Sequence, residues 1–269
     1  MSGSPVPVLM YHAVADVPSR AARRLSVAPV AFAQQMELLA AGGFTPVTAG
    51  RLAEAWRDRR PLPPRPVLIT FDDGYEGVHR HALAALKGHG FVATLFVSTG
   101  WLRGRPAADL TPGAPDTMLD WAQVGELAAA GLEIGAHSHS HPQLDQLPDE
   151  HLWFEVVRCK EILHEELGTA PGSFAYPYGY SSRRVRRFVR AAGYGVGLAV
   201  GNGMAHPTQG PYALRRVTVR RSTGIEEFER LVEGRRLGFH FASDRALTRS
   251  YAIIRRTRRA VRKVREASV

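Results

Sequence analysis

The stretch VLITFDDG, Val67 to Gly74, decides the fold class of this chain. Its first five residues are apolar or β-branched, which predicts a strand buried on both faces, as in a parallel sheet covered by helices. Two carboxylates close the strand, and Gly74 permits a sharp turn directly after them. Active sites of parallel α/β barrels assemble at the carboxyl ends of the strands. We therefore expect Asp72 and Asp73 at a functional edge, although such a pair can also cap a helix.

Short β-rich apolar runs alternate with helical patterns on both sides of this strand. Strands are predicted at residues 5–12, 67–71, 93–97, 133–137, 173–176, 196–200 and 213–219. Helices are predicted at residues 30–41, 48–58, 78–87, 121–130, 149–167, 182–192 and 225–234. This alternation predicts βα units around a parallel sheet, and 269 residues suffice for one domain of that kind.

The composition indicates the cellular compartment in which we expect this protein. No apolar run approaches the roughly 18 residues of a membrane span, and the first residues lack the basic and apolar regions of a signal peptide. Cys159 is the single cysteine, which excludes an internal disulfide and fits a reducing compartment. We expect a cytoplasmic protein in which Cys159 packs in the interior.

The net charge of +10 is concentrated at one end of the chain. Residues 244–269 carry nine Lys or Arg and two Asp or Glu, and their apolar residues recur at helical spacing. We expect a basic amphipathic C-terminal helix there, after a domain of residues 1–243. It either meets an anionic membrane surface, at the inner membrane face, or packs its apolar stripe on the domain. Nucleic acid is not expected as a partner, because the rest of the chain is only weakly basic.

The segment HSHSH places His137 and His141 four residues apart, a spacing that brings two imidazoles to one metal ion. His139 would then point elsewhere. A histidine-rich polar loop is the alternative interpretation of this segment alone. Two imidazoles and one carboxylate together form a site that leaves positions open for water and substrate. The combination is therefore more specific than either motif.

Three motifs carry a family resemblance: TFDDG at 70–74, EIGAHSHSHPQL at 133–144 and FAYPYG at 174–179. Together they resemble the NodB-homology domain of polysaccharide deacetylases, carbohydrate esterase family four, over residues 5–219. The resemblance implies a single irregular (β/α) barrel with about seven parallel strands. It also implies that Asp72 is the general base, that Asp73, His137 and His141 bind metal, and that the backbone N–H of Tyr178 binds the oxyanion.

Two departures from the family pattern stand out. Ala175 occupies the place of the arginine that orients the catalytic aspartate, and the late motifs, including a leucine-x-histidine, are not visible after Val200. The N-terminal VLMYH, residues 8–12, is similar to the opening strand of a permuted subgroup that includes deacetylases of biofilm poly-N-acetylglucosamine. His12 would then supply the missing general acid, protonated, unless it is a structural histidine at a strand end.

The resemblance and the motifs together predict a metal-dependent N-deacetylase that releases acetate from an N-acetylated amino sugar, within a glycan, a glycolipid or a glycosylated small molecule. The cofactor is expected to be one divalent ion, Zn²⁺, with Co²⁺, Ni²⁺ or Fe²⁺ as alternatives. Trp101, Pro177 and Tyr178 are expected to bind substrate, and residues 100–118 to form one wall of a cleft. The alternatives are a hydrolase of another C–N bond, such as a cyclic amide or imide, and a catalytically inactive carbohydrate-binding domain.

Overall fold

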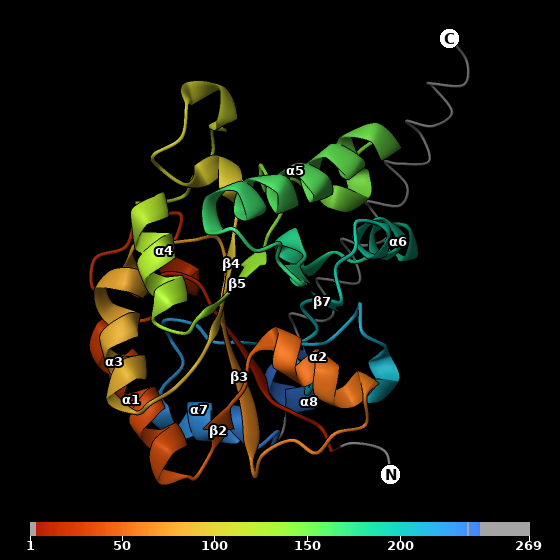
Figure 1. The fold of residues 1–269 in the computed structure, drawn as a ribbon. Coiled ribbons are helices and arrows are strands. Elements are labelled where there is room, and N and C mark those ends of the chain that lie inside the picture. Colours follow the sequence, from red (N-terminus) through yellow and green to blue (C-terminus); the bar gives the residue numbers. More distant parts are fainter. Residues whose placement is uncertain (1–3, 236, 243–269) are drawn as a thin grey trace.

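The computed structural model describes residues 4–235 and 237–242 (Figure 1). A curled sheet forms its centre, with strands in the order β7-β6-β5-β4-β3-β1-β8, and β2 pairs with β3 beside this path. The strands are β1 Val8–Tyr11, β2 Thr45–Pro46, β3 Pro66–Phe71, β4 Thr94–Val97, β5 Glu133–Ala136, β6 Ser173–Ala175, β7 Val196–Leu198 and β8 Val217–Thr218. Every pair of neighbouring strands is parallel, which confirms the predicted sheet of seven parallel strands in an irregular barrel.

Helices surround the sheet, with α1, α3 and α4 on one flank and α5 and α6 on another (Figure 1). They are α1 Pro29–Ala41, α2 Ala49–Arg57, α3 Leu83–Gly88, α4 Trp121–Ala129, α5 Asp149–Leu167, α6 Arg183–Ala191, α7 Ile225–Val232 and α8 Leu237–His240. Their ends follow from local chemistry: Pro29 opens α1, and the Thr48 side chain accepts a hydrogen bond from the backbone of α2. The helix predicted at 78–87 is divided into a π-helical turn, Val78–Ala82, and α3.

The strand predicted at 213–219 is regular only over Val217–Thr218, because the chain changes neighbours along it. Leu214 pairs with Leu198 of β7, whereas Val217 pairs with Leu9 of β1. The backbone continues this exchange, since Ala199 donates to Leu214 O at 2.8 Å and Val219 donates to Met10 O at 3.0 Å. This segment therefore joins the two edges of the curled sheet.

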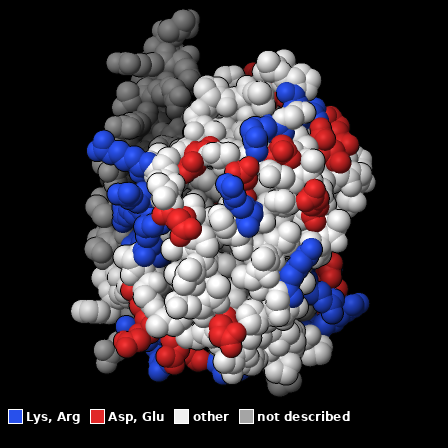
Figure 2. Space-filling model, turned by 90° about the vertical axis from the view of Figure 1, so that its left-hand side faces the viewer, with Lys and Arg blue, Asp and Glu red and all other residues white. Residues whose placement is uncertain are grey.

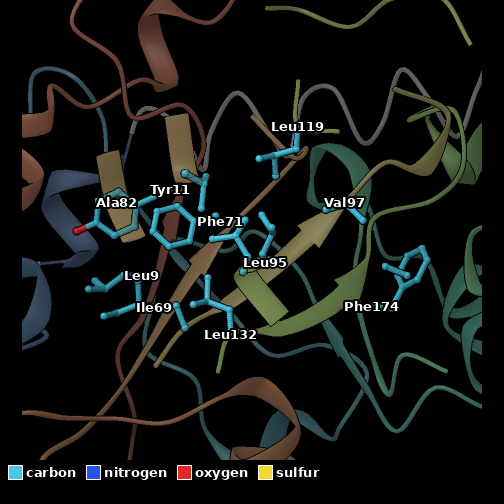
Figure 3. Close-up of a cluster of buried hydrophobic side chains, with 14 of the residues drawn as sticks. Leu9, Tyr11, Ile69, Phe71, Ala82, Leu95, Val97, Leu119, Leu132 and Phe174 are labelled. Carbon is cyan, nitrogen blue, oxygen red and sulfur yellow. The ribbon is translucent and has the colours of Figure 1, made fainter. Parts of the chain in front are cut away.

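Successive residues of each strand point to opposite sides of the sheet, and both sides are buried. Leu9 and Tyr11 of β1, with Phe71 of β3, pack outward against the helices in the cluster of Figure 3. Val8 and Leu68 face inward, into a second apolar cluster inside the barrel. The alternation matters for function, because it fixes which residues beyond each strand end face the interior.

Helix α2 covers the end of the barrel at which the strands begin. Its first amides donate to side chains at the start of two strands: Ala49 N to Thr94 Oγ1 at 3.0 Å, and Gly50 N to Glu133 Oε2 at 2.8 Å. The opposite end, where the strands finish, is left for the polar residues named above.

Lys and Arg side chains alternate with Asp and Glu in mixed clusters on the face seen in Figure 2, around broad uncharged areas. Within the described ranges, no helix is both long enough and apolar enough to cross a membrane. The predicted basic helix of residues 244–269, and the domain boundary before it, lie outside the described residues.

Candidate metal centre and active site

Strand alternation brings the polar residues of three strand ends to one place. Because side chains alternate along a strand, His12 points to the same inner side of the sheet as Val8 of β1. For the same reason, Asp72 points to the same inner side as Leu68 of β3. His137 follows β5 directly and also lies in the interior, where it is almost completely buried. Side chains from β1, β3 and β5 therefore meet inside the barrel at the carboxyl ends of the strands, as the sequence predicted.

Asp73, His137 and His141 form a candidate metal-ligand set. Asp73 Oδ1 lies 3.3 Å from Nε2 of His137 and 3.3 Å from Nε2 of His141, and ligand atoms of all three residues lie within 4.8 Å of one another. Asp73 (φ 75°) and His141 (φ 58°) both adopt the left-handed conformation that non-glycine residues rarely occupy. Such strain is typical of functional sites whose surroundings enforce it.

The chemistry of these donors fits a divalent cation. The Nδ1 atom of His137 lies 2.8 Å from the carbonyl oxygen of Ala175, so Nδ1–H can donate there, and Nε2 is the nitrogen that a cation would bind. Asp73 Oδ1 is buried and has no hydrogen-bond partner among the described residues. Burial alone would raise the pKa of Asp73, but the two imidazoles outweigh it and hold that pKa well below its ordinary value. A buried, ionised oxygen facing two imidazole nitrogens is suited to bind a cation.

The sequence did not show which residue replaces the arginine sought at Ala175. In the structure, Arg216 contacts Asp72. Its Nη1 donates to Asp72 Oδ1 at 2.6 Å and its Nη2 to Asp72 Oδ2 at 2.7 Å, in a bidentate pair. Arg216 is 0% exposed and Asp72 2%, so no solvent screens the two charges. Burial alone would raise the pKa of Asp72, but the positive charge of Arg216 outweighs it and lowers that pKa. Asp72 is therefore a carboxylate at neutral pH.

The other hydrogen bonds of Arg216 fix its direction. Its Nε donates to Ala199 O at 3.3 Å and its Nη1 also reaches Thr70 Oγ1 at 3.3 Å. Arg216 stands in the segment that joins the sheet edges, far along the chain from the Ala175 position where an arginine was sought. A signal for it was present, because Leu214 and Arg216 share one face of a predicted strand, and a charge on an apolar face needs a buried partner.

A cleft of about 530 Å³ opens over these groups. His12, Trp101 and Tyr178 are among its lining residues, together with the four groups Asp72, Asp73, His137 and His141. Pro177 is buried beneath this surface and is not one of the lining residues. Gly113 and Pro115 come from the predicted wall of residues 100–118, so that this loop does border the cleft.

Aromatic rings flank the exposed side of the metal-ligand set. The ring of Trp101 lies 4.7 Å from that of His141, and the ring of Tyr178 lies 4.8 Å from it. Tyr178 is half-exposed and left-handed (φ 57°). These two rings therefore border the cleft on either side of His141.

Two further histidines differ in their surroundings. Burial lowers the pKa of His12 despite the nearby Asp73 and Asp72, which favours the neutral ring. The role of His12 as general acid stays a prediction. The His139 ring instead lies 3.0 Å from Thr99 Oγ1 through its Nδ1 atom, and it is not part of the ligand set. Cys159 is buried, as predicted.

Comparisons with known proteins identify the family. The family model described as polysaccharide deacetylase matches residues 59–197, just over half of the chain. YxkH of Bacillus subtilis (strain 168), which carries the name of the same family, is 29% identical over 217 residues, covering 80% of this chain and 71% of YxkH.

Two more relatives extend the comparison. The poly-β-1,6-N-acetyl-D-glucosamine N-deacetylase of Escherichia coli (strain K12) is 24% identical over 240 residues, covering 77% of this chain but only 35% of that enzyme. The structure of the Streptococcus pyogenes deacetylase PplD superposes with a TM-score of 0.75 at 24% identity, covering 85% of this chain and 98% of that one. On the match to the family model, this chain belongs to the polysaccharide deacetylase family.

Proposed function

We propose that this chain hydrolyses the acetamide group of an N-acetylated amino sugar with the help of one divalent cation and releases acetate. One observation carries the proposal: a buried carboxylate, Asp72, is held ionised by Arg216 directly beside the ligand set of Asp73, His137 and His141. A base that stays charged in a desolvated site next to a cation site is the arrangement that metal-assisted hydrolysis requires.

Asp73, His137 and His141 would hold the cation, with Zn²⁺ as our first candidate and Co²⁺, Ni²⁺ or Fe²⁺ as alternatives. When bound, such an ion supplies Lewis acidity that polarises the acetamide carbonyl and lowers the pKa of the attacking water. Three protein ligands leave coordination positions open for both, as catalytic metal sites do.

The remaining chemistry falls to groups of the chain itself. Asp72 takes a proton from the water as it attacks the carbonyl carbon, while Arg216 keeps the carboxylate fixed and ionised. The backbone N–H of Tyr178, in the loop that borders the cleft, donates to the developing oxyanion. The proton that Asp72 takes from the water has to reach the leaving amine. Because burial keeps the ring of His12 neutral, His12 takes this proton from Asp72 and passes it to the amine as the C–N bond breaks.

The shape of the cleft and the relatives both support an amino-sugar substrate. A volume of about 530 Å³ accommodates sugar residues, and Trp101 and Tyr178 offer them apolar faces. The E. coli relative is named for the N-deacetylation of poly-β-1,6-N-acetyl-D-glucosamine. A purely carbohydrate-binding module would not need a buried carboxylate beside a cation site, and hydrolysis of a cyclic amide or imide would release no acetate.

Metal content and acetate release test the proposal together. After dialysis, the purified protein should retain about one equivalent of a divalent metal, and it should release acetate from N-acetylglucosamine oligomers. His137→Ala should contain little metal and release none. Absence of metal in the wild-type protein, even after zinc is supplied, would favour the binding-module alternative. Bound metal without acetate release, together with opening of a cyclic imide, would favour the other hydrolase.

A further inference from the structure

Glu155 of α5 is a buried carboxylate that the reaction itself does not use. It is 7% exposed, and its oxygens face the loop between the two histidine ligands. Glu155 Oε2 accepts the backbone N–H of His139 at 2.9 Å and that of Ser140 at 2.8 Å. Its Oε1 accepts the hydroxyl of Ser140. Three donors of two successive residues thus converge on a single side chain from a neighbouring helix.

The loop that Glu155 contacts has a demanding backbone. Ser138 (φ 67°) and His141 (φ 58°) are both left-handed, which is unfavourable for residues with a Cβ atom. Within the loop, the Ser138 hydroxyl accepts the backbone N–H of His141 at 3.0 Å. The conformation that directs His141 toward Asp73 is therefore costly on its own and has to be stabilised from outside.

The same loop is also connected to the next strand end. His139 O accepts the N–H of Gly100 at 2.8 Å, and the His139 ring contacts Thr99. Ser98 Oγ donates to His137 O at 3.1 Å. These contacts join His137 and His139 to residues 98–100, which follow β4. Ser140 is instead held by Glu155 of α5.

We infer that Glu155 is a positioning residue, which keeps residues 138–141 in the ligand-presenting conformation before the metal binds. The inference rests on the metal site of the proposed function. Without this side chain, the Ser140 N–H would lose its acceptor, and the His139 N–H would keep only the Glu155 backbone carbonyl oxygen at 3.1 Å. The strained loop would then relax toward ordinary backbone angles. Part of the binding free energy of the metal would then be needed to restore the loop.

The test measures zinc affinity and does not depend on turnover. Metal-free protein competes with a chromogenic chelator for Zn²⁺, and the dissociation constant is compared among wild type, Glu155→Ala and Glu155→Gln. The alanine variant should bind Zn²⁺ about 10- to 100-fold more weakly, the range found when groups supporting metal ligands are removed. Glutamine should restore affinity to within about fivefold, because its oxygen can accept both N–H groups and its amide can donate to Ser140.

A matched control separates positioning from general destabilisation. Ile162→Ala removes a fully buried side chain elsewhere on α5 and should lower the resistance to urea without changing the zinc dissociation constant. Should Glu155→Ala fail to fold, Glu155→Asp keeps the charge but shortens the reach, and it should also weaken zinc binding.

The outcomes distinguish the inference from the proposed function. Wild-type affinity in a folded Glu155→Ala or Glu155→Asp protein would overturn the inference and leave the proposed function intact. An equal loss of affinity in Ile162→Ala would overturn it as well. No zinc binding by the wild-type protein would instead remove the proposed function, and the inference with it.

Discussion

Replacing Arg216 with methionine would remove the guanidinium from Asp72 and keep a side chain of similar length inside the barrel. In the wild-type protein, the two N–H···O contacts of 2.6 and 2.7 Å hold the carboxylate in its ionised form. In the variant, Asp72 would be a buried acid without its cationic partner, and burial would be the largest influence on its pKa.

The size of the effect follows from the burial of both groups. Leaving one member of a buried ion pair unpaired costs about 3–5 kcal/mol. Protonation of Asp72 would relieve this cost, so loss of the guanidinium would raise the pKa of Asp72. The wild-type pKa lies below the ordinary value of 3.8, and the variant pKa would be higher because burial would no longer be opposed by Arg216. A general base works only when ionised, and the acid limb of kcat/KM must therefore move to higher pH.

The assay is acetate release from an N-acetylated oligosaccharide between pH 5 and 9, at saturating metal. Asp72 of the wild-type protein stays ionised over this whole range, so its ionisation should not limit kcat/KM at the acid end. Arg216→Met should instead lose activity toward the acid end, because its Asp72 becomes protonated there. Arg215→Met is the matched control, because this neighbouring arginine is exposed and should leave the profile unchanged. A folded, metal-loaded Arg216→Met protein whose acid limb stays at the wild-type position would refute the reasoning.

Three further predictions concern the base, the metal and the core. Asp72→Asn should abolish acetate release yet retain about one equivalent of metal by elemental analysis, whereas His137→Ala should lose both; near-wild-type turnover of Asp72→Asn would show that the base is misassigned. Treatment with a strong chelator should stop acetate release, and added Zn²⁺ should restore it; turnover that persists after complete metal removal would contradict the metal site. Leu95→Ala should lower the free energy of urea unfolding by about 2–5 kcal/mol, because Leu95 is 0% exposed in the core (Figure 3). The control Val17→Ala changes a side chain that is 88% exposed and should alter this free energy by less than about 0.5 kcal/mol. Equal effects of the two substitutions would show that the core is wrongly placed.

Local chemistry made most of the fold predictable. Helix α5 begins and ends as predicted, at Asp149 and Leu167. Helix α1 starts at Pro29, and α2 starts at Ala49, directly after its cap Thr48. The buried strands were readable for the same reason, since each is a short apolar run between turns. The least accurate prediction was the strand at 213–219, because its pairing is divided between β7 and β1 and no local pattern records that exchange.

The candidate site was predictable wherever a motif holds its residues together. Asp72 with Asp73, and His137 with His141, are near neighbours in sequence. Strand alternation places Asp72 and His137 inside the barrel, and the left-handed backbone at Asp73 and His141 brings their side chains to the same place. Pro177 shows the limit of this reasoning: it belongs to a motif beside the cleft, but its side chain is packed beneath the surface that lines it.

The sequence by itself determined a helix-covered parallel sheet with two carboxylates and two imidazoles at the ends of its strands. Only the tertiary structure decided that Arg216 completes this set, and that Glu155 supports the loop that presents His141. Arg216 lies 144 residues from Asp72, and Glu155 contacts the histidine loop across the gap between a helix and a strand end. The physical reason is that periodicity reports only which face a residue occupies, whereas an ion pair or hydrogen bond depends on which distant segment the barrel closure brings within 3 Å.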